Sequence, residues 1–116
     1  MGLRQKVADI IAPSGAPAPQ VFLSELVRLE CRVGALKQGA VELLRKYDAF
    51  FALPGVSMLG LGRAEFDRAT DLRARFGLKT PDALHLAAAE LARCDAFLTG
   101  DQRLSRYDLG VEVLVM

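Results

Sequence analysis

The sequence has few of the features that mark membrane, secreted or metal–thiolate proteins. Its 116 residues contain no apolar run of the roughly 18 to 20 residues that a membrane helix needs. Residues 1–15 carry charges throughout and lack an apolar signal core, so we expect a cytoplasmic protein. The two cysteines, Cys31 and Cys94, are far apart and form no CxxC pair. We expect them to be reduced, buried thiols with no metal or redox role.

The sequence also lacks an excess of charge of one sign. Fifteen Lys and Arg residues face 14 Asp and Glu residues, for a net charge of +1, so any contact with nucleic acid must come from a local patch. Hydrophobic residues make up 52% and charged residues 25%, which excludes a disordered chain. This length and composition predict a single globular domain over residues 1–116.

Short apolar runs alternate with helical patterns along the chain. Ser24 is expected to cap the helix that follows the first run, and Gly34 is expected to end it. Near-continuous apolar strands separated by helices favour a three-layer α/β/α fold with a mostly parallel sheet. The predicted strands are 21–23, 56–61, 95–99 and 111–115, and the predicted helices are 3–11, 25–33, 37–51, 63–76, 80–90 and a short turn at 102–106.

Three acidic residues fall where predicted strands lead into helices. Glu30 lies on the helix after strand 21–23, and Asp82 lies in the first turn of a later helix. Asp101 directly follows strand 95–99. In an open parallel sheet such positions share the edge at which ligands bind. Carboxylates gathered there repel one another, and a magnesium or manganese ion with oxygen ligands is the usual solution.

Each acidic residue also has a purely structural interpretation. Asp82 follows Thr80, a good N-cap, and Pro81, a favoured first helical residue, and its charge complements the helix dipole. Asp101 would equally cap the short helix after it, and Glu30 would be a solvated surface carboxylate. Spacing within the helices does not decide between these interpretations and a shared site.

Three stretches of the sequence resemble the PIN domain, in particular the VapC-like toxins of bacterial toxin–antitoxin pairs. They are "SELVRLECRVGALKQG", "ARFGLKTPDALHLAAAELARCDAFLTGDQRL" and "GVEVLVM", and the similarity covers almost all of the chain from about Val21 onward. The resemblance implies a ribonuclease that depends on Mg²⁺ or Mn²⁺ and a cognate VapB-like antitoxin that inhibits it. It also implies hydrolysis of RNA phosphodiester bonds.

The resemblance assigns roles to individual residues of this chain. It implies that Glu30, Asp82 and Asp101 bind the metal and act in catalysis. His85 and Thr99 match supporting positions, and His85 shares a helix face with Asp82. Four basic residues near the proposed edge are candidates for binding RNA phosphates, although a solvated surface charge is the simpler interpretation of each: Arg28, Arg32, Lys79 and Arg103.

One part of the PIN pattern is missing. PIN domains open with a central strand that carries an aspartate, in a pattern like "YLDTSAL", and no stretch of this sequence matches it. Asp9 lies at helical spacing and is not a substitute. We therefore expect a PIN-like domain without its first, central strand. Either strands 21–23 and 95–99 pair directly, or a second chain fills the gap between them.

The missing strand has consequences for assembly and activity. We expect a homodimer or larger oligomer, and weak or absent nuclease activity in this chain. A catalytically inactive PIN-like module that retains antitoxin or RNA binding is the main alternative. A flavodoxin-like regulator that holds one magnesium ion is a third, but the sequence lacks a convincing acidic pair beside a phosphorylatable aspartate.

Overall fold

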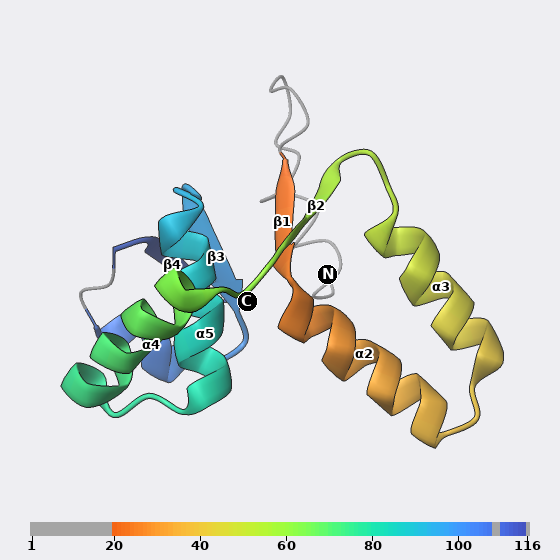
Figure 1. Cartoon of the computed structure of the whole chain (residues 1–116), viewed down its shortest axis with the longest axis horizontal. Coiled ribbons are helices and arrows are strands. Elements are labelled where there is room, and N and C mark those ends of the chain that lie inside the picture. The colour runs from red at the N-terminus through yellow and green to blue at the C-terminus, as the bar shows by residue number, and fades with distance from the viewer. Residues whose placement is uncertain (1–19, 108–109, 116) are drawn as a thin grey trace.

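The computed structural model describes residues 20–107 and 110–115, so the helix predicted at 3–11 and Asp9 lie outside the described residues. The described strands and helices follow the predicted order (Figure 1). In chain order they are β1 (Val21–Ser24), α2 (Glu25–Lys37), α3 (Val41–Phe51), β2 (Val56–Leu59), α4 (Arg63–Phe76), α5 (Thr80–Leu91), β3 (Ala96–Thr99), the short 3₁₀ helix η1 (Gln102–Arg106) and β4 (Glu112–Val115).

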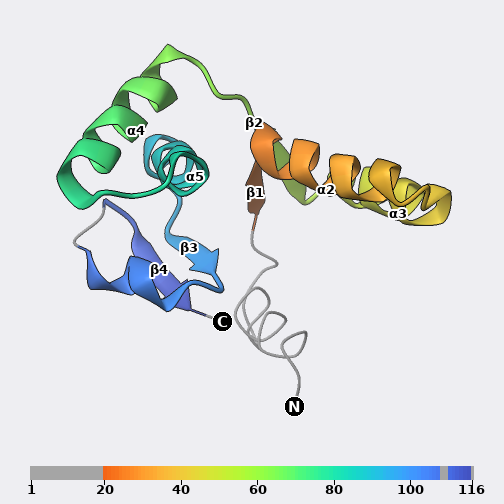
Figure 2. The ribbon, with the colours of Figure 1, turned by 90° about the horizontal axis from the view of Figure 1, so that it is seen from below.

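The described elements form two groups, which lie on opposite sides of Figure 1. In the first group β1 pairs in parallel with β2, and α2 and α3 pack side by side and project away from the strands (Figure 2). In the second group β3 pairs in parallel with β4, and α4 packs on α5. We call residues 20–59 the arm half, and residues 63–107 with 110–115 the core half. Residues 60–62 connect them.

The α/β fold class and the parallel pairing are confirmed, but the strands form two sheets instead of one. Within the described residues, β1 pairs only with β2 and β3 pairs only with β4. Direct pairing of strands 21–23 and 95–99, one of our two expectations, is therefore wrong for the described part of the chain. Helix α5 contacts both β1 and β3, so it spans the two sheets. Each of these strands keeps one edge without a described partner.

The hydrophobic core lies in the core half and is centred on α5. Ala83 and Ala87 are fully buried there, and α5 makes its most extensive contacts with α4. The structure places α4 against the alanines of α5. Small side chains allow the two helix axes to approach closely. The buried cluster consists of Ala69, Leu72, Leu78, Ala83, Leu84, Leu86, Ala87, Leu104 and Val111.

Helix α2 begins as predicted but ends later. Ser24 is its N-cap, and its Oγ accepts a hydrogen bond from the backbone N–H of Val27 at 3.4 Å. The prediction that Gly34 ends the helix is wrong, because α2 continues to Lys37. Ala35, the next residue, is only 1% exposed. The buried Ala35 side chain helps to offset the modest cost of a glycine inside a helix.

Helix α5 also begins differently from the prediction. Thr80 is the first helical residue, and Lys79 is the N-cap and makes no side-chain capping bond. Pro81 lies in the first turn, where its missing N–H costs nothing. The predicted capping role of Thr80 is therefore wrong. No helix in the described ranges combines the length and the apolar character that crossing a membrane requires.

Candidate functional site

The candidate site lies where β1 and β3 end and α5 begins. Glu30 is exposed on α2, and Asp82 is half-buried in the first turn of α5. Their negative charges both act on His85, which lies one turn after Asp82. Arg103 is close enough to Asp82 and Asp101 to feel the charge of both. The acidic residues of the two halves are therefore electrostatic neighbours through His85 and Arg103.

The carboxylates do not converge to coordination distance. In residues 20–107 and 110–115, no group of three or more His, Cys, Asp or Glu side chains is placed to hold a metal ion. Oxygen donors of this kind suit a hard divalent cation. In the described residues, however, these three carboxylates are not gathered closely enough to hold an ion together.

His85 contacts the first strand of the arm half. Its Nδ1 lies 2.9 Å from Oγ of Ser24, which is 6% exposed. Burial lowers the pKa of His85 below its ordinary value, and the charges of Glu30 and Asp82 oppose this only in part. The imidazole is therefore neutral at pH 7. The tautomer of the ring decides whether the Ser24 hydroxyl donates to Nδ1 or Nδ1–H donates to the Ser24 oxygen, and in both cases that oxygen accepts the N–H of Val27.

Asp101 is held by Arg103. The backbone N–H of Arg103 donates to Oδ1 at 2.9 Å, and its guanidinium donates to both carboxylate oxygens, at 2.7 Å for Nη2 to Oδ2. These bonds lower the pKa of Asp101 to about 2, so it stays ionised well into the acid range. Thr99 Oγ1 accepts from the backbone N–H of Asp101 at 3.1 Å. The capping role predicted for Asp101 is confirmed, since it is the N-cap of η1.

Three of the four predicted RNA-binding residues are engaged within the chain. Arg32 is paired with Asp48 of α3, and Arg28 lies 4.0 Å from Glu25. Arg103 is paired with Asp101, as described above. Lys79 is exposed at the start of α5, and its charge acts on Asp101. Of these four residues, Lys79 is the one for which the described part of the chain provides no ion-pair partner.

The sequence did not identify Ser24 as a partner of His85. Ser24 was expected only to cap α2, and 61 positions separate the two residues. No periodicity within one helix or strand reports a contact over that distance. The thiols also differ from expectation, because Cys31 and Cys94 are free but only partly buried. Burial is nevertheless the main reason that the pKa of each thiol is raised.

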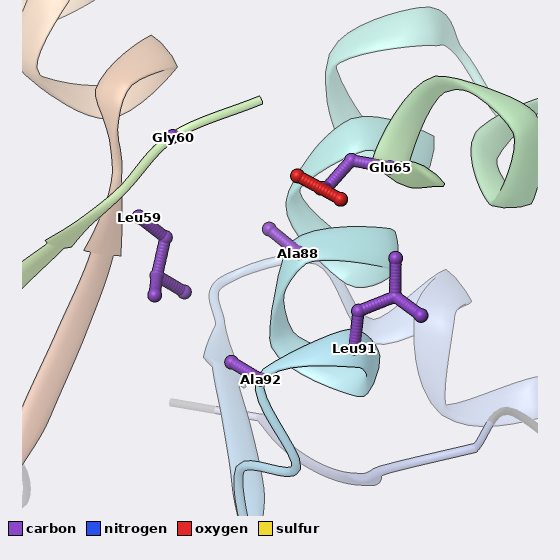
Figure 3. Close-up of a pocket in the computed structure, with 6 residues that line it drawn as sticks. All are labelled: Leu59, Gly60, Glu65, Ala88, Leu91 and Ala92. Atoms are coloured by element: carbon purple, nitrogen blue, oxygen red, sulfur yellow. The ribbon is translucent and has the colours of Figure 1, made fainter. Parts of the chain in front are cut away.

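A pocket of about 200 Å³ lies between the two halves, and Glu30, Asp82 and Asp101 do not line it (Figure 3). Leu59 and Gly60 approach it from the end of β2, and Glu65 lies on α4. Oε1 of Glu65 accepts a hydrogen bond from the backbone N–H of Gly62 at 2.9 Å. The remaining lining residues are Ala88, Leu91 and Ala92 of α5. The pocket is mostly apolar and contains none of the predicted site residues.

The helices and the parallel strand pairs define an α/β protein, and comparison with known proteins identifies the family. The PIN domain family matches residues 3–109, so the chain belongs to that family. A chain in the solved structure of a toxin–antitoxin complex from Klebsiella pneumoniae is 26% identical, with a TM-score of 0.70. The match covers 98% of this chain and 85% of that chain. No protein with a curated description matches the sequence.

Proposed function

We propose that this chain is a metal-dependent ribonuclease of the VapC-like toxin type that hydrolyses RNA phosphodiester bonds. The observation that carries the proposal is the set of acidic residues around His85 and Arg103, in a chain that belongs to the PIN domain family. Glu30, Asp82 and Asp101 would have to draw together to hold Mg²⁺ or Mn²⁺, which would then activate water and stabilise developing negative charge. Because these carboxylates do not converge in the described structure, we expect slow cleavage.

The remaining residues of the edge have supporting roles in this proposal. Lys79, exposed beside Asp101, attracts RNA phosphates, and Arg28, Arg32 and Arg103 supply further positive charge near the site. His85 is neutral and does not add positive charge beside the carboxylates. The net charge of +1 leaves these local cations as the source of RNA affinity.

The first test compares cleavage of single-stranded RNA by the unaltered chain and by Asp82→Asn, with and without Mg²⁺ or Mn²⁺. We expect slow cleavage that requires the metal and that falls below detection in Asp82→Asn. Asp67→Asn is the matched control, because Asp67 is an exposed acid on α4 outside the site. Cleavage that survives chelation of metals, or that persists in Asp82→Asn, contradicts the proposal.

A second candidate function is an inactive module that binds RNA or an antitoxin. The absence of a three-donor group in the described residues favours it. In that case RNA binding, measured by fluorescence anisotropy, persists while no cleavage occurs at any metal concentration. Lys79→Ala then weakens RNA binding and reduces its salt dependence, whereas Asp82→Asn does not.

We propose that the protein partner is a VapB-like antitoxin and that the chain acts in the cytoplasm as a dimer or larger oligomer. The similar chain of known structure comes from a toxin–antitoxin complex. The arm half also exposes apolar side chains that a partner would cover, including Leu29, Val33 and Leu36 at helical spacing on α2. Sedimentation velocity of the chain, alone and co-expressed with the antitoxin, tests both parts. A stable monomer that binds no antitoxin contradicts them.

A further inference from the structure

The joint between the arm half and the core half has few connections. Residues 60–62 join the halves covalently and lie outside any helix or strand. Leu26 and Leu61 pack against the core cluster. The pocket beside Leu59 shows that packing does not fill this joint completely (Figure 3). Few apolar contacts therefore hold the two halves together on the pocket side.

One polar contact crosses this joint. Among the residues that the structure describes, the pair Ser24 Oγ and His85 Nδ1 is the one hydrogen bond or ion pair whose two ends lie in different halves. Other polar contacts link elements within a half, as Arg68 of α4 does to Glu90 of α5. Ser24 is largely shielded from water, so water competes weakly for this bond.

The bond is compatible with either protonation state of the imidazole. A serine hydroxyl is both a donor and an acceptor, whereas Nδ1 accepts in one neutral tautomer and donates when the ring is protonated. Ser24 can therefore remain bonded to His85 whether the ring is neutral or charged. The contact therefore joins the arm half to the core half in either protonation state of the ring, and it does not act as a pH switch.

The bond joins the two helices that carry Glu30 and Asp82. Ser24 is the N-cap of α2, and Glu30 lies six residues further, about 9 Å along the helix axis. His85 lies one turn after Asp82 on α5. A bond between Ser24 and His85 therefore fixes the start of α2 against α5, and so sets where Glu30 stands relative to Asp82.

We propose that Ser24 and His85 are positioning residues that latch the arm half onto α5 and thereby fix the position of Glu30 relative to Asp82. The effect on cleavage rests on the proposed function, but the geometric effect does not. Without the latch, the halves are joined by residues 60–62, by the contacts between β1 and α5, and by the apolar packing of Leu26 and Leu61. The angle between the halves then varies, and the position of Glu30 relative to Asp82 varies with it.

The test measures the distance between the halves directly. Spin labels are attached at Gln38→Cys, just after α2, and at Ala74→Cys on α4, two exposed positions in different halves. The native thiols are removed by Cys31→Ser and Cys94→Ala. Pulsed electron–electron double resonance then gives the distribution of distances between the two labels without metal or RNA. Its result therefore does not depend on ribonuclease activity.

His85→Leu is expected to broaden this distribution and shift it to longer distances. His85→Asn, which retains a polar atom close to the position of Nδ1, is expected to stay near the unaltered chain. If His85→Leu does not fold, Ser24→Val compared with Ser24→Thr provides the same comparison at the other end of the bond. Distributions for His85→Leu, or for Ser24→Val, that superimpose on the unaltered one overturn the latch.

The catalytic consequence has a separate readout. If the unaltered chain cleaves RNA, His85→Leu lowers the cleavage rate and weakens Mn²⁺ binding, and His85→Asn restores both in part. If the unaltered chain does not cleave RNA, the proposed function fails while the distance measurement still decides the latch. A His85→Leu chain with broadened distances but unchanged cleavage rate and Mn²⁺ affinity refutes the positioning role.

Discussion

At the scale of single residues, Arg103 lowers the pKa of Asp101. Its side-chain hydrogen bonds are the main reason that the pKa of Asp101 falls to about 2. The same bonds occupy both carboxylate oxygens, so a cation that binds Asp101 must share them with the guanidinium or displace it. A residue expected to bind RNA therefore restrains a residue expected to bind metal.

Replacing this arginine tests that relation. In Arg103→Gln, the pKa of Asp101 is expected to rise from about 2 toward the ordinary value of about 3.9, because the guanidinium bonds are lost. NMR titration of the carboxyl carbon measures it. Arg106→Gln, an exposed substitution in the same 3₁₀ helix, is the control. An unchanged pKa in Arg103→Gln contradicts the assignment.

The same shift predicts how stability depends on pH. The folded-state pKa of Asp101 is below its unfolded value, so the contribution of the Asp101–Arg103 pair to stability is complete above about pH 4. It is lost as the pH falls toward 2. Arg103→Gln is expected to reduce this dependence between pH 4 and pH 2, with the backbone N–H of residue 103 still bonded to Asp101, and acid-unfolding curves of the two chains measure the difference.

At the scale of elements, the alanines of α5 determine how closely α4 approaches. Ala87 is fully buried at this contact. Ala87→Leu is expected to lower the free energy of unfolding by about 1–3 kcal/mol, because a close-packed contact has no space for the added atoms. Urea denaturation measures the change. Ala64→Leu, an exposed position on α4, is the control and should have little effect.

The sequence predicted most elements but not all of their boundaries or partners. Apolar runs located the four described strands because buried parallel strands read as continuous hydrophobic segments. Local rules failed at Gly34 and Thr80, where the position of the helix end is set by packing and by the preceding backbone. The positions of Glu30, Asp82 and Asp101 after predicted strands also predicted that these residues share one edge of the sheet. The sequence did not reveal that β1 and β3 lie in separate sheets, or that Ser24 meets His85.

At the scale of the whole molecule, the two halves differ in how much they bury. The radius of gyration is 15.0 Å, compared with about 13 Å for a compact domain of about 100 residues. Within residues 20–59 the buried residues are Ser24, Ala35 and Phe51, whereas α5 alone buries six. The arm half therefore has much less apolar burial to resist local opening.

Hydrogen exchange is expected to separate the halves. Backbone amides in the middle of α2 and α3 should exchange about tenfold or more faster than those in the middle of α5, because opening the arm exposes little buried surface. Mass spectrometry of exchanged peptides measures this difference. Equal protection of α3 and α5 in the isolated chain would show that the arm is stabilised by contacts outside those described.

The open edges of β1 and β3 also affect the solubility of the protein. Each strand presents backbone N–H and C=O groups without a described strand partner on one side, and Phe22 on β1 is 39% exposed. Such edges can template non-native pairing between copies of a chain as its concentration rises. The protein should therefore aggregate less when it is synthesised together with a partner that covers these edges. A covered strand has no unpaired N–H or C=O groups with which another copy can pair.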